Sequence, residues 1–294
     1  YGATQVGLPV LRFGFNNDLG FTNTVNTMQG FTSYKLVLEG DGYRFDGKTL
    51  PFDTVTKSYK VKQADGTLKS VSFEQKSTVH GPVFTLPDGK TTVALKVAGL
   101  DRPGVLEQYL EMGKARDWGA FEKALRKMQV VMFNIIYADR AGHILYLDNG
   151  LLPKHASGDL KYWSTPVPGD TSATLWKDVH SYDDMPKLID PATGFVQNAN
   201  DPPWLATWPR ALDPKSFPAY VAPVGPMSQR AQMSVKLMSQ TPKISFDDFV
   251  SRKLTTTSLM AERMLPDLLA AAAGSNDAEA VSYTHLTLPT ILLV

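Results

Sequence analysis

The sequence predicts an α+β fold built on antiparallel strands, and three observations support this prediction. Asp-Gly pairs at 41–42, 46–47, 65–66 and 88–89 divide the first hundred residues into short segments of strand-like composition, which is typical of successive hairpins. From residue 105 onward, apolar residues recur at helical spacing. A further hairpin pattern then surrounds the turn at 139–142.

The strands of the first hundred residues are expected to form an antiparallel meander. Segment 10–15 is short and apolar, and segment 31–38 alternates with a period of two. Between the Asp-Gly turns we expect strands over 55–62, 68–75, 79–85 and 91–97. Two more strands, 130–138 and 143–147, are expected on either side of the later turn.

Two helices are expected in the middle of the chain. The first covers 105–113 and ends near Gly113. Asp117 is placed to cap the second. One face of that helix carries the apolar residues Trp118, Phe121, Leu125 and Met128.

The rest of the chain is expected to be irregular and then helical. Segment 151–226 is rich in Pro, Gly, Asp and Trp and predicts a long irregular loop, which in a compact domain is usually functional. Helical patterning returns at Ser228, and Ser245 resembles the start of a capping box. A last helix over 258–273 contains Pro266, which predicts a bend.

Composition and charge exclude several classes of protein. The 294 residues are 43% apolar and 20% charged, which excludes low-complexity disorder. Lys and Arg number 30 against 29 Asp and Glu, so no global field attracts nucleic acid or an anionic membrane. The sequence contains no run of about 18 apolar residues, so no membrane-spanning helix is predicted. We therefore expect neither nucleic acid nor membrane as a partner, and the absence of Cys excludes disulfides and thiolate chemistry.

The two ends of the sequence suggest a piece of a longer polypeptide. The chain begins at Tyr1 within an established apolar pattern. Residues 281–294 carry no charged side chain apart from His285 and resemble translated adapter sequence. We predict a single domain over 1–280 and a non-native tail over 281–294, with a genuine terminal strand as the alternative.

No complete catalytic motif is present. The five His residues are scattered without zinc-site spacing, and nucleophile-elbow, P-loop and dinucleotide motifs are absent. The adjacent carboxylates at 183–184 and 247–248 would point in different directions in a helix or a strand, so they are poor candidates for an acid–base pair. Two polar loops remain, 14–26 and 194–204, where apolar segments run into Gly- and Asn-rich backbone. Such loops are either plain turns or functional segments.

Several segments occur in the order found in one known family. They are Gly7-Leu8-Pro9-Val10, Phe13-Gly14-Phe15-Asn16, 19–25, Val79-His80-Gly81-Pro82, 114–118, Tyr137-Ala138-Asp139, 142–146, Val167-Pro168-Gly169, Trp176-Lys177 and 194–200. Over about residues 5–270 the sequence resembles the penicillin amidase family of N-terminal nucleophile (Ntn) hydrolases, and most closely its acyl-homoserine-lactone acylase branch. The resemblance implies a four-layer αββα sandwich with antiparallel sheets, incomplete in this chain.

The resemblance also implies a mechanism of amide hydrolysis. In this family a Ser, Thr or Cys exposed by self-cleavage is the nucleophile, and its own α-amine is the base. One backbone N–H and one Asn amide hold the oxyanion. The matching positions are Val25 for the backbone donor and Asn200 for the amide, and Arg230 matches the Arg that supports both the amide and the nucleophile's amine.

The acyl pocket of the family has five matching positions, which are Phe13, Asn23, Met132, Phe133 and Ile135. Four of them are apolar and suit an aliphatic or an aryl-acetyl group. Met132 and Ile135 fit ordinary core positions equally well.

Two departures from the family pattern shape the prediction. The nucleophile is not among these residues, and the resemblance places it upstream. Penicillin acylases bind calcium through Asp residues where this sequence has Gln29 and Thr32, so we expect no metal here. No cofactor is expected either. The homoserine-lactone branch also lacks the calcium site.

We therefore expect part of an amidohydrolase that cleaves acyl-homoserine lactones or related N-acyl amines through an upstream N-terminal Ser. Its partner is an α-chain from the same precursor, and the chain alone is expected to be inactive. One alternative is a β-lactam acylase acting on penicillin or cephalosporin side chains. Another is a non-catalytic β-rich binding protein. The resemblance implies a periplasmic or secreted location.

Overall fold

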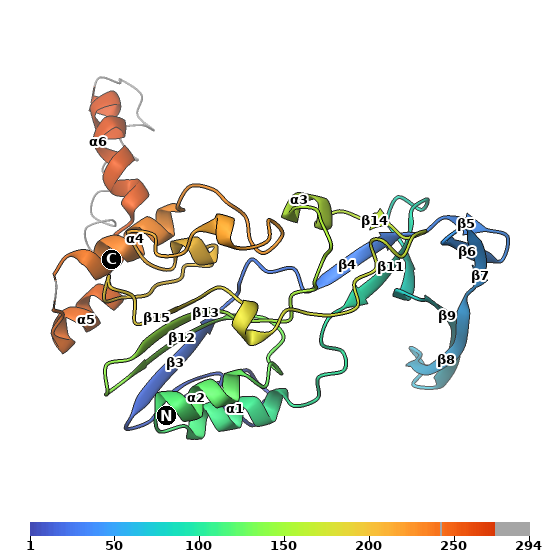
Figure 1. Cartoon of the computed structure of the whole chain (residues 1–294), viewed down its shortest axis with the longest axis horizontal. Coiled ribbons are helices and arrows are strands. Elements are labelled where there is room, and N and C mark those ends of the chain that lie inside the picture. The colour runs from blue at the N-terminus through green and yellow to red at the C-terminus, as the bar shows by residue number, and fades with distance from the viewer. Residues whose placement is uncertain (242, 274–294) are drawn as a thin grey trace.

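The computed structural model describes residues 1–241 and 243–273, which form three sheets and two groups of helices (Figure 1). The first sheet has the strand order β1 (Gly2–Ala3), β2 (Phe13–Phe15), β3 (Leu19–Thr24), β12 (Asn134–Asp139), β13 (Ile144–Asp148) and β15 (Lys187–Ile189). The second has the order β14 (Val167–Pro168), β4 (Phe31–Lys35), β11 (Thr92–Val97), β10 (Gly81–Thr85), β9 (Leu68–Thr78) and β8 (Asp53–Lys62). The third contains β5 (Leu38–Glu39), β6 (Gly42–Phe45) and β7 (Lys48–Pro51).

The strand pairing is antiparallel apart from the contact between β14 and β4, which is parallel. The central pair of the first sheet, β3 and β12, runs in register from Leu19 opposite Asp139 to Thr24 opposite Asn134. This register matters for the site because it brings the end of β3 to the start of β12.

Helices α1 (Val105–Lys114) and α2 (Trp118–Leu125) cover one face of the first sheet (Figure 1). The long segment that follows β13 contains α3 (Leu160–Trp163) and the short 3-10 turns η1 (Tyr182–Asp184), η2 (Pro203–Leu205) and η3 (Pro214–Ser216). The chain then continues in α4 (Gln229–Ser239), α5 (Phe246–Lys253) and α6 (Leu259–Ala273). None of the described helices combines the length and the apolar character that crossing a membrane requires.

The main core lies between the first sheet and these two helices. Phe121 of α2 is fully buried, and its ring centroid lies 4.5 Å from that of Tyr137 on β12 and 5.4 Å from that of Phe21 on β3. These spacings are those of favourable aromatic pairs, which stabilise a core by about 0.5–1.5 kcal/mol each beyond area burial. The helix layer is thus fixed to the sheet by two rings that lie opposite each other on the paired strands β3 and β12.

The opposite face of the first sheet is covered by irregular chain. Tyr146 and Ile136 project from this face and pack with Val196, Ala206 and Leu212. The α+β class and the antiparallel sheets are as predicted. Of the expected layers, the helix layer and the first sheet are seen stacked within the described residues.

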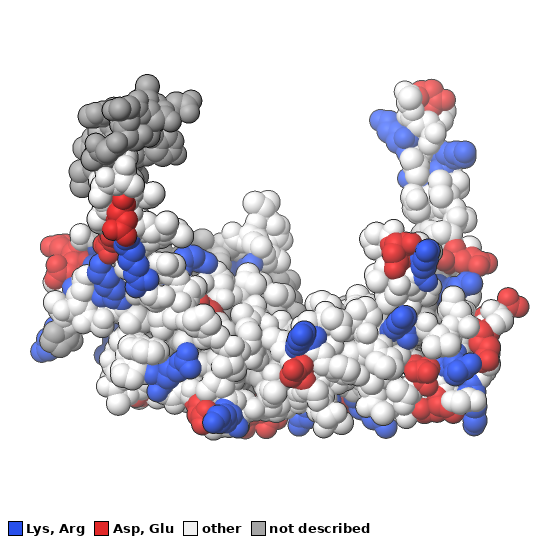
Figure 2. All heavy atoms as spheres, turned by 90° about the horizontal axis from the view of Figure 1, so that it is seen from above, with Lys and Arg blue, Asp and Glu red and all other residues white. Residues whose placement is uncertain are grey.

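The second sheet ends in a long hairpin. Strands β8 and β9 pair over ten positions, from Asp53 opposite Ser77 to Lys62 opposite Leu68, and most of their side chains are exposed. Figure 2 shows projections at the two ends of the long axis with a hollow between them, and acidic and basic side chains are intermixed on this face.

Most strands and helices expected from the sequence are found within a few residues, but several differ. Strands β6 and β7 of the third sheet were not expected. A strand over Leu19–Thr24 was not expected, because this segment was interpreted as loop. The strand expected over 10–15 covers only Phe13–Phe15. The strand expected over 31–38 divides into β4 and β5. The irregular character of 151–226 is confirmed.

A further difference concerns Met128, which was placed on the face of the second helix. Helix α2 ends at Leu125, and Met128 has a φ of 50°. The reason is Gln108, whose Oε1 accepts hydrogen bonds from the backbone N–H groups of Gln129 and Val130. These bonds draw the chain away from the helix axis and toward β12. The proposed tail, 281–294, lies outside the described residues.

Candidate active site

The end of β3 and the start of β12 place two polar side chains together. Thr24 lies opposite Asn134 in the ladder, and Asn134 Nδ2 donates to Thr24 Oγ1 at 3.1 Å. Side chains alternate across a sheet, so these two lie on the face opposite α1 and α2. Tyr146 donates its hydroxyl proton to Asn134 Oδ1 at 2.7 Å and fixes the orientation of this buried amide.

Asn198 joins the irregular loop to this strand pair. Its Oδ1 accepts from Thr24 Oγ1, from Asn134 Nδ2 at 3.1 Å, and from the backbone N–H of Asn200 at 2.8 Å. Its Nδ2 donates to the carbonyl of Asp201 at 3.0 Å. One side chain therefore ties the loop that carries Asn200 to the strand that leads to Val25.

Asn200 sits at the tip of this loop with an orientation fixed from two sides. Its φ is 65°, a left-handed conformation that Asn tolerates better than most residues. Its Nδ2 donates to the carbonyl oxygen of Val25 at 2.9 Å, and its Oδ1 accepts from Arg230 Nη1 at 3.1 Å. Because the guanidinium can only donate, the contact with Arg230 requires the amide nitrogen to face Val25.

Helix α4 supplies Arg230 from its first turn. Ser228 caps this helix, since its Oγ accepts from the Ala231 N–H at 3.2 Å. The same hydroxyl donates to Asp201 Oδ1 at 2.8 Å. The helix start is thus bonded to the residue after Asn200, and this fixes the distance between Arg230 and the amide.

Val25 follows β3 directly and is exposed. Its carbonyl oxygen accepts from Asn200 and from Asn134 Nδ2, the latter at 3.3 Å. Within residues 1–241 and 243–273, its N–H donates to no protein acceptor. The structure therefore brings Val25, Asn200 and Arg230 into one hydrogen-bonded group, with one backbone donor available.

The five acyl-pocket candidates lie in different environments. Ile135 is fully buried in the main core, Asn23 is buried beside it on the same face, and Met132 is 40% exposed. Phe13 and Phe133 are half-buried, and Phe133 has a φ of 109°. The five residues flank the end of the β3–β12 pair, and their role in binding an acyl group stays a prediction.

A buried polar group that sequence reasoning missed accompanies them. Arg12 is 7% exposed, and its guanidinium carbon lies 4.3 Å from the ring centroid of Phe133, a cation–π distance. Asn23 Nδ2 donates to the Tyr109 hydroxyl at 2.9 Å. Burial raises the pKa of Tyr109, although Arg12 and Asn23 act in the opposite direction, so the hydroxyl stays protonated at neutral pH.

Comparison with known proteins identifies the family. The family described as penicillin amidase matches residues 1–288. The chain belongs to the penicillin amidase family. It is 30% identical to the acyl-homoserine lactone acylase PvdQ of Pseudomonas syringae pv. syringae (strain B728a) over 297 aligned positions, which cover 91% of this chain and 38% of that protein. The corresponding protein of Pseudomonas putida is 29% identical over 95% of this chain and 39% of its own length.

Penicillin G acylases are also similar. The enzyme from Escherichia coli is 26% identical over 93% of this chain and 31% of its own length. The solved structure of a thermostable penicillin G acylase from Alcaligenes faecalis matches with a TM-score of 0.72 at 22% identity, covering 96% of this chain and 49% of that one. This match shows the fold, which is that of an Ntn hydrolase. The chain spans less than half the length of the curated relatives it matches.

The two positions that the resemblance matches to calcium ligands, Gln29 and Thr32, are engaged in protein contacts here. Thr32 is fully buried, and its Oγ1 accepts from Trp176 Nε1 at 3.1 Å. Gln29 Oε1 accepts from Ser164 Oγ at 3.1 Å. Among the described residues no group of three or more His, Cys, Asp or Glu could hold a metal ion. The absence of a metal from the working protein stays a prediction.

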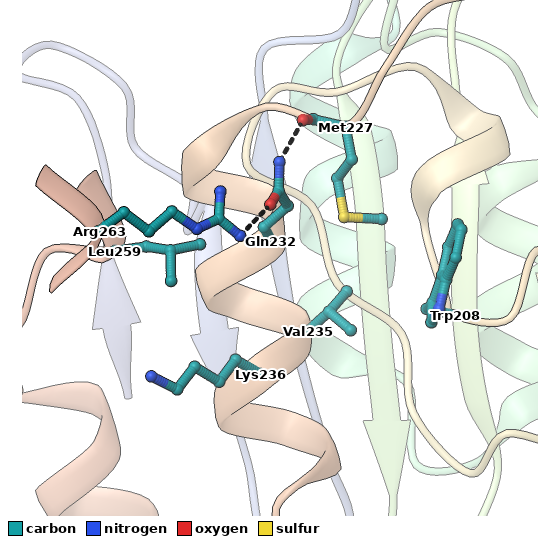
Figure 3. Close-up of a pocket in the computed structure, with 7 residues that line it drawn as sticks. All are labelled: Trp208, Met227, Gln232, Val235, Lys236, Leu259 and Arg263. Atoms are coloured by element: carbon teal, nitrogen blue, oxygen red, sulfur yellow. Dashed lines mark hydrogen bonds between the residues drawn. The ribbon is translucent and has the colours of Figure 1, made fainter.

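A pocket of about 410 Å³ is lined by residues of α4 and α6 together with Trp208 and Met227 (Figure 3). Gln232 connects the two helices in this pocket. Its Nε2 donates to the Met227 carbonyl at 2.8 Å, and its Oε1 accepts from Arg263 Nη2 at 2.7 Å. Through Gln232, these contacts connect α6 to the first turns of α4.

His80, one of the five scattered His residues, is buried in aromatic packing. It is 3% exposed and packs against Tyr34 with ring centroids 4.2 Å apart. Burial, together with the nearby Lys96, lowers its pKa to about 4. It is therefore neutral at physiological pH. It lies far from Asn200 in the sequence, and its hydrogen bonds and ring contacts involve other residues.

Proposed function

We propose that this chain supplies the oxyanion-binding part of an acylase that hydrolyses the amide bond of N-acyl substrates. The observation that carries the proposal is the contact of Asn200 with the Val25 peptide, with Arg230 fixing the amide. A tetrahedral intermediate places negative charge on the former carbonyl oxygen. The Val25 N–H and the Asn200 amide are the donors we assign to that oxygen.

The proposed nucleophile is an N-terminal Ser outside these 294 residues, exposed by self-cleavage of a precursor. Its α-amine would take the proton from its own hydroxyl, so that nucleophile and base are one residue. Arg230 would keep the amide of Asn200 aimed at the oxyanion and would lie near the amine. An α-chain from the same precursor is the proposed partner, and the proposed location is the periplasm or the exterior of the cell.

For the substrate we propose an acyl-homoserine lactone or a related N-acyl amine. The relatives named acyl-homoserine lactone acylase cover 91% or more of this chain at 29–30% identity, which favours this amine over a β-lactam nucleus. A panel of homoserine lactones of increasing acyl length, tested beside penicillin G and a cephalosporin, separates the two. Preference for the β-lactams would support the alternative of a β-lactam acylase.

Asn200→Ala in the full-length protein tests the mechanism. Removing one oxyanion donor should lower kcat by about 100-fold or more. The matched control is Asn17→Ala, because Asn17 is exposed and its side chain makes no hydrogen bond within the described residues. Turnover within about tenfold of the unaltered protein would refute the assignment of Asn200. An upstream sequence without Ser, Thr or Cys at the cleavage point would favour a non-catalytic binding protein.

A further inference from the structure

A buried carboxylate lies next to the Val25 segment and has no part in the mechanism above. Asp148 is the last residue of β13 and is fully buried. Its Oδ1 accepts from Asn26 Nδ2 at 3.1 Å, and the same nitrogen donates to the carbonyl of Asn149 at 2.9 Å. Its Oδ2 has no hydrogen-bond partner among the described residues.

This carboxylate is costly to bury. No Lys, Arg or His pairs with Asp148 within the described parts of the chain, and a single neutral amide compensates little of the lost hydration. Burial raises its pKa to about 7. A position that served packing alone would be filled at lower cost by an apolar residue. The hydrogen bond to Asn26 is therefore the feature that can explain why an Asp occupies this position.

Asn26 connects Asp148 to the proposed oxyanion donors. It follows Val25 directly, and the peptide group between the two residues carries the carbonyl that accepts from Asn200. On the other side of Val25, Thr24 Oγ1 is bonded to Asn198. Val25 is thus held between two side-chain anchors, Thr24 and Asn26. Asp148 lies at the buried end of the second anchor.

We propose that Asp148 is a positioning residue for the amide hydrolysis proposed above. By accepting from Asn26, it holds the peptide groups on either side of Val25 in the orientation that stabilises the transition state. Asp148 itself makes no hydrogen bond to Val25 or Asn200. The inference rests on the proposed function, and it assigns to Asp148 an effect on kcat that exceeds any effect on KM.

The test compares four variants of the full-length protein by steady-state kinetics on an acyl-homoserine lactone. Asp148→Ala should lower kcat by about 10-fold to 100-fold, since small misplacements of catalytic groups have effects of this size, while KM changes by less than about threefold. Asp148→Asn should keep kcat within about threefold, because its Oδ1 accepts the same bond. Asn26→Ala should match Asp148→Ala. The double variant Asn26→Ala/Asp148→Ala should lose no more kcat than either single variant, because both substitutions remove the same contact.

Gln108→Ala is the control for loss of a buried polar side chain. Gln108 is fully buried on α1 and holds the backbone at Gln129 and Val130. This variant should lower Tm and leave the kcat of the folded protein unchanged. If Asp148→Ala does not fold, Asn26→Ala and Asp148→Asn carry the comparison.

Three results would overturn the proposal: an unchanged kcat in Asp148→Ala or Asn26→Ala, an Asp148→Asn variant as impaired as Asp148→Ala, or losses that add in the double variant. The proposed function is tested separately. If Asn200→Ala lowers kcat as expected while Asn26→Ala leaves kcat unchanged, only the role of Asp148 fails. If the unaltered protein cleaves none of the acyl amides, both fail.

Discussion

At the scale of single residues, the site depends on how one amide is oriented. An Asn side chain presents a donor and an acceptor of nearly equal size, so its orientation is set by its partners. Arg230 offers only donors and bonds Asn200 Oδ1 at 3.1 Å. Without this contact nothing on that side prevents the amide from turning its oxygen toward Val25, where it would repel both the carbonyl and an oxyanion.

Arg230→Met should therefore lower kcat while keeping the apolar stem of the side chain. A hydrogen bond from a charged donor is worth about 1.5–3 kcal/mol, which corresponds to roughly a 10-fold to 100-fold loss. Steady-state kinetics on the full-length protein measures this. Arg263→Met on α6 is the control, because Arg263 bonds Gln232 and not Asn200. Equal kcat values for Arg230→Met and the unaltered protein would show that Asn200 is oriented by other contacts.

The buried carboxyl of Asp148 makes a prediction about stability and pH. Burial raises its pKa from 3.8 to about 7 in the folded state. Its stabilising contribution is complete below the unfolded pKa and is lost as pH rises through 7. Asp148→Asn removes this loss, so thermal unfolding should show a Tm advantage for the variant that grows between pH 4.5 and pH 8.5.

The size of that advantage follows from the shift, at about 1.4 kcal/mol for each pKa unit, so about 4 kcal/mol is the upper limit. Asp190→Asn is the control of opposite sign. Asp190 bonds His143, which lowers the pKa of this carboxyl, and its replacement should give no gain at high pH. A constant Tm difference between Asp148→Asn and the unaltered protein across the pH range would contradict the prediction.

The residues of the site were predictable to different degrees. Val25, Asn200 and Arg230 came from family resemblance, and the structure places them in hydrogen-bonded contact. The supporting residues Asn26, Asn134 and Asp148 carried no motif. Their importance arises from register, because Asn134 lies opposite both Thr24 and Asp148 in adjacent ladders, and pairing between distant segments is not encoded in local spacing.

At the scale of elements, the sequence predicted helix caps correctly where the hydrogen bond of a single side chain fixes the local backbone. Asp117 was predicted as an N-cap, and its Oδ1 accepts from the Ala120 N–H at 2.8 Å. Asn16 has a similar local role, since its Oδ1 accepts from the N–H groups of Asp18 and Leu19. The polar residues of the first loop thus include plain turn formers. Strand β3 was interpreted as loop because Gly, Thr and Asn interrupt its apolar pattern.

Asp117→Ala should destabilise the protein by about 1 kcal/mol, because an N-cap side chain satisfies an otherwise unpaired backbone N–H. Helix α2 buries Phe121, Ala124 and Leu125, so fraying at its start reaches the main core. Ser245→Ala removes the analogous cap of α5, a helix with no buried residue in the described structure. Thermal unfolding should show a larger fall in Tm for Asp117→Ala, and an equal fall would contradict this reasoning.

At the scale of the whole molecule, the class of fold was predictable and the assembly of its layers was not. Period-two segments and Asp-Gly turns predicted the hairpins of the second sheet, which connect neighbours in sequence. The first sheet instead joins β3 to β12 across more than a hundred residues. The site lies on that joint, together with a loop from the irregular segment. Resemblance to a family could predict which residues meet at the site, because members of a family share the whole fold.

The share of the relatives' length that this chain covers leads to the last prediction. This chain covers 38–39% of the length of its acyl-homoserine lactone acylase relatives, and the proposal assigns the nucleophile to a residue outside it. Oxyanion donors without a nucleophile stabilise a charge that does not form. The purified 294-residue chain should hydrolyse an acyl-homoserine lactone at least about 10³-fold more slowly than the full-length protein. Release of the fatty acid measured by chromatography checks this, with Asn200→Ala of the isolated chain as the background. Comparable rates for the isolated and full-length proteins would mean that the nucleophile lies among these residues, and the assignment of an external N-terminal Ser would have to be abandoned.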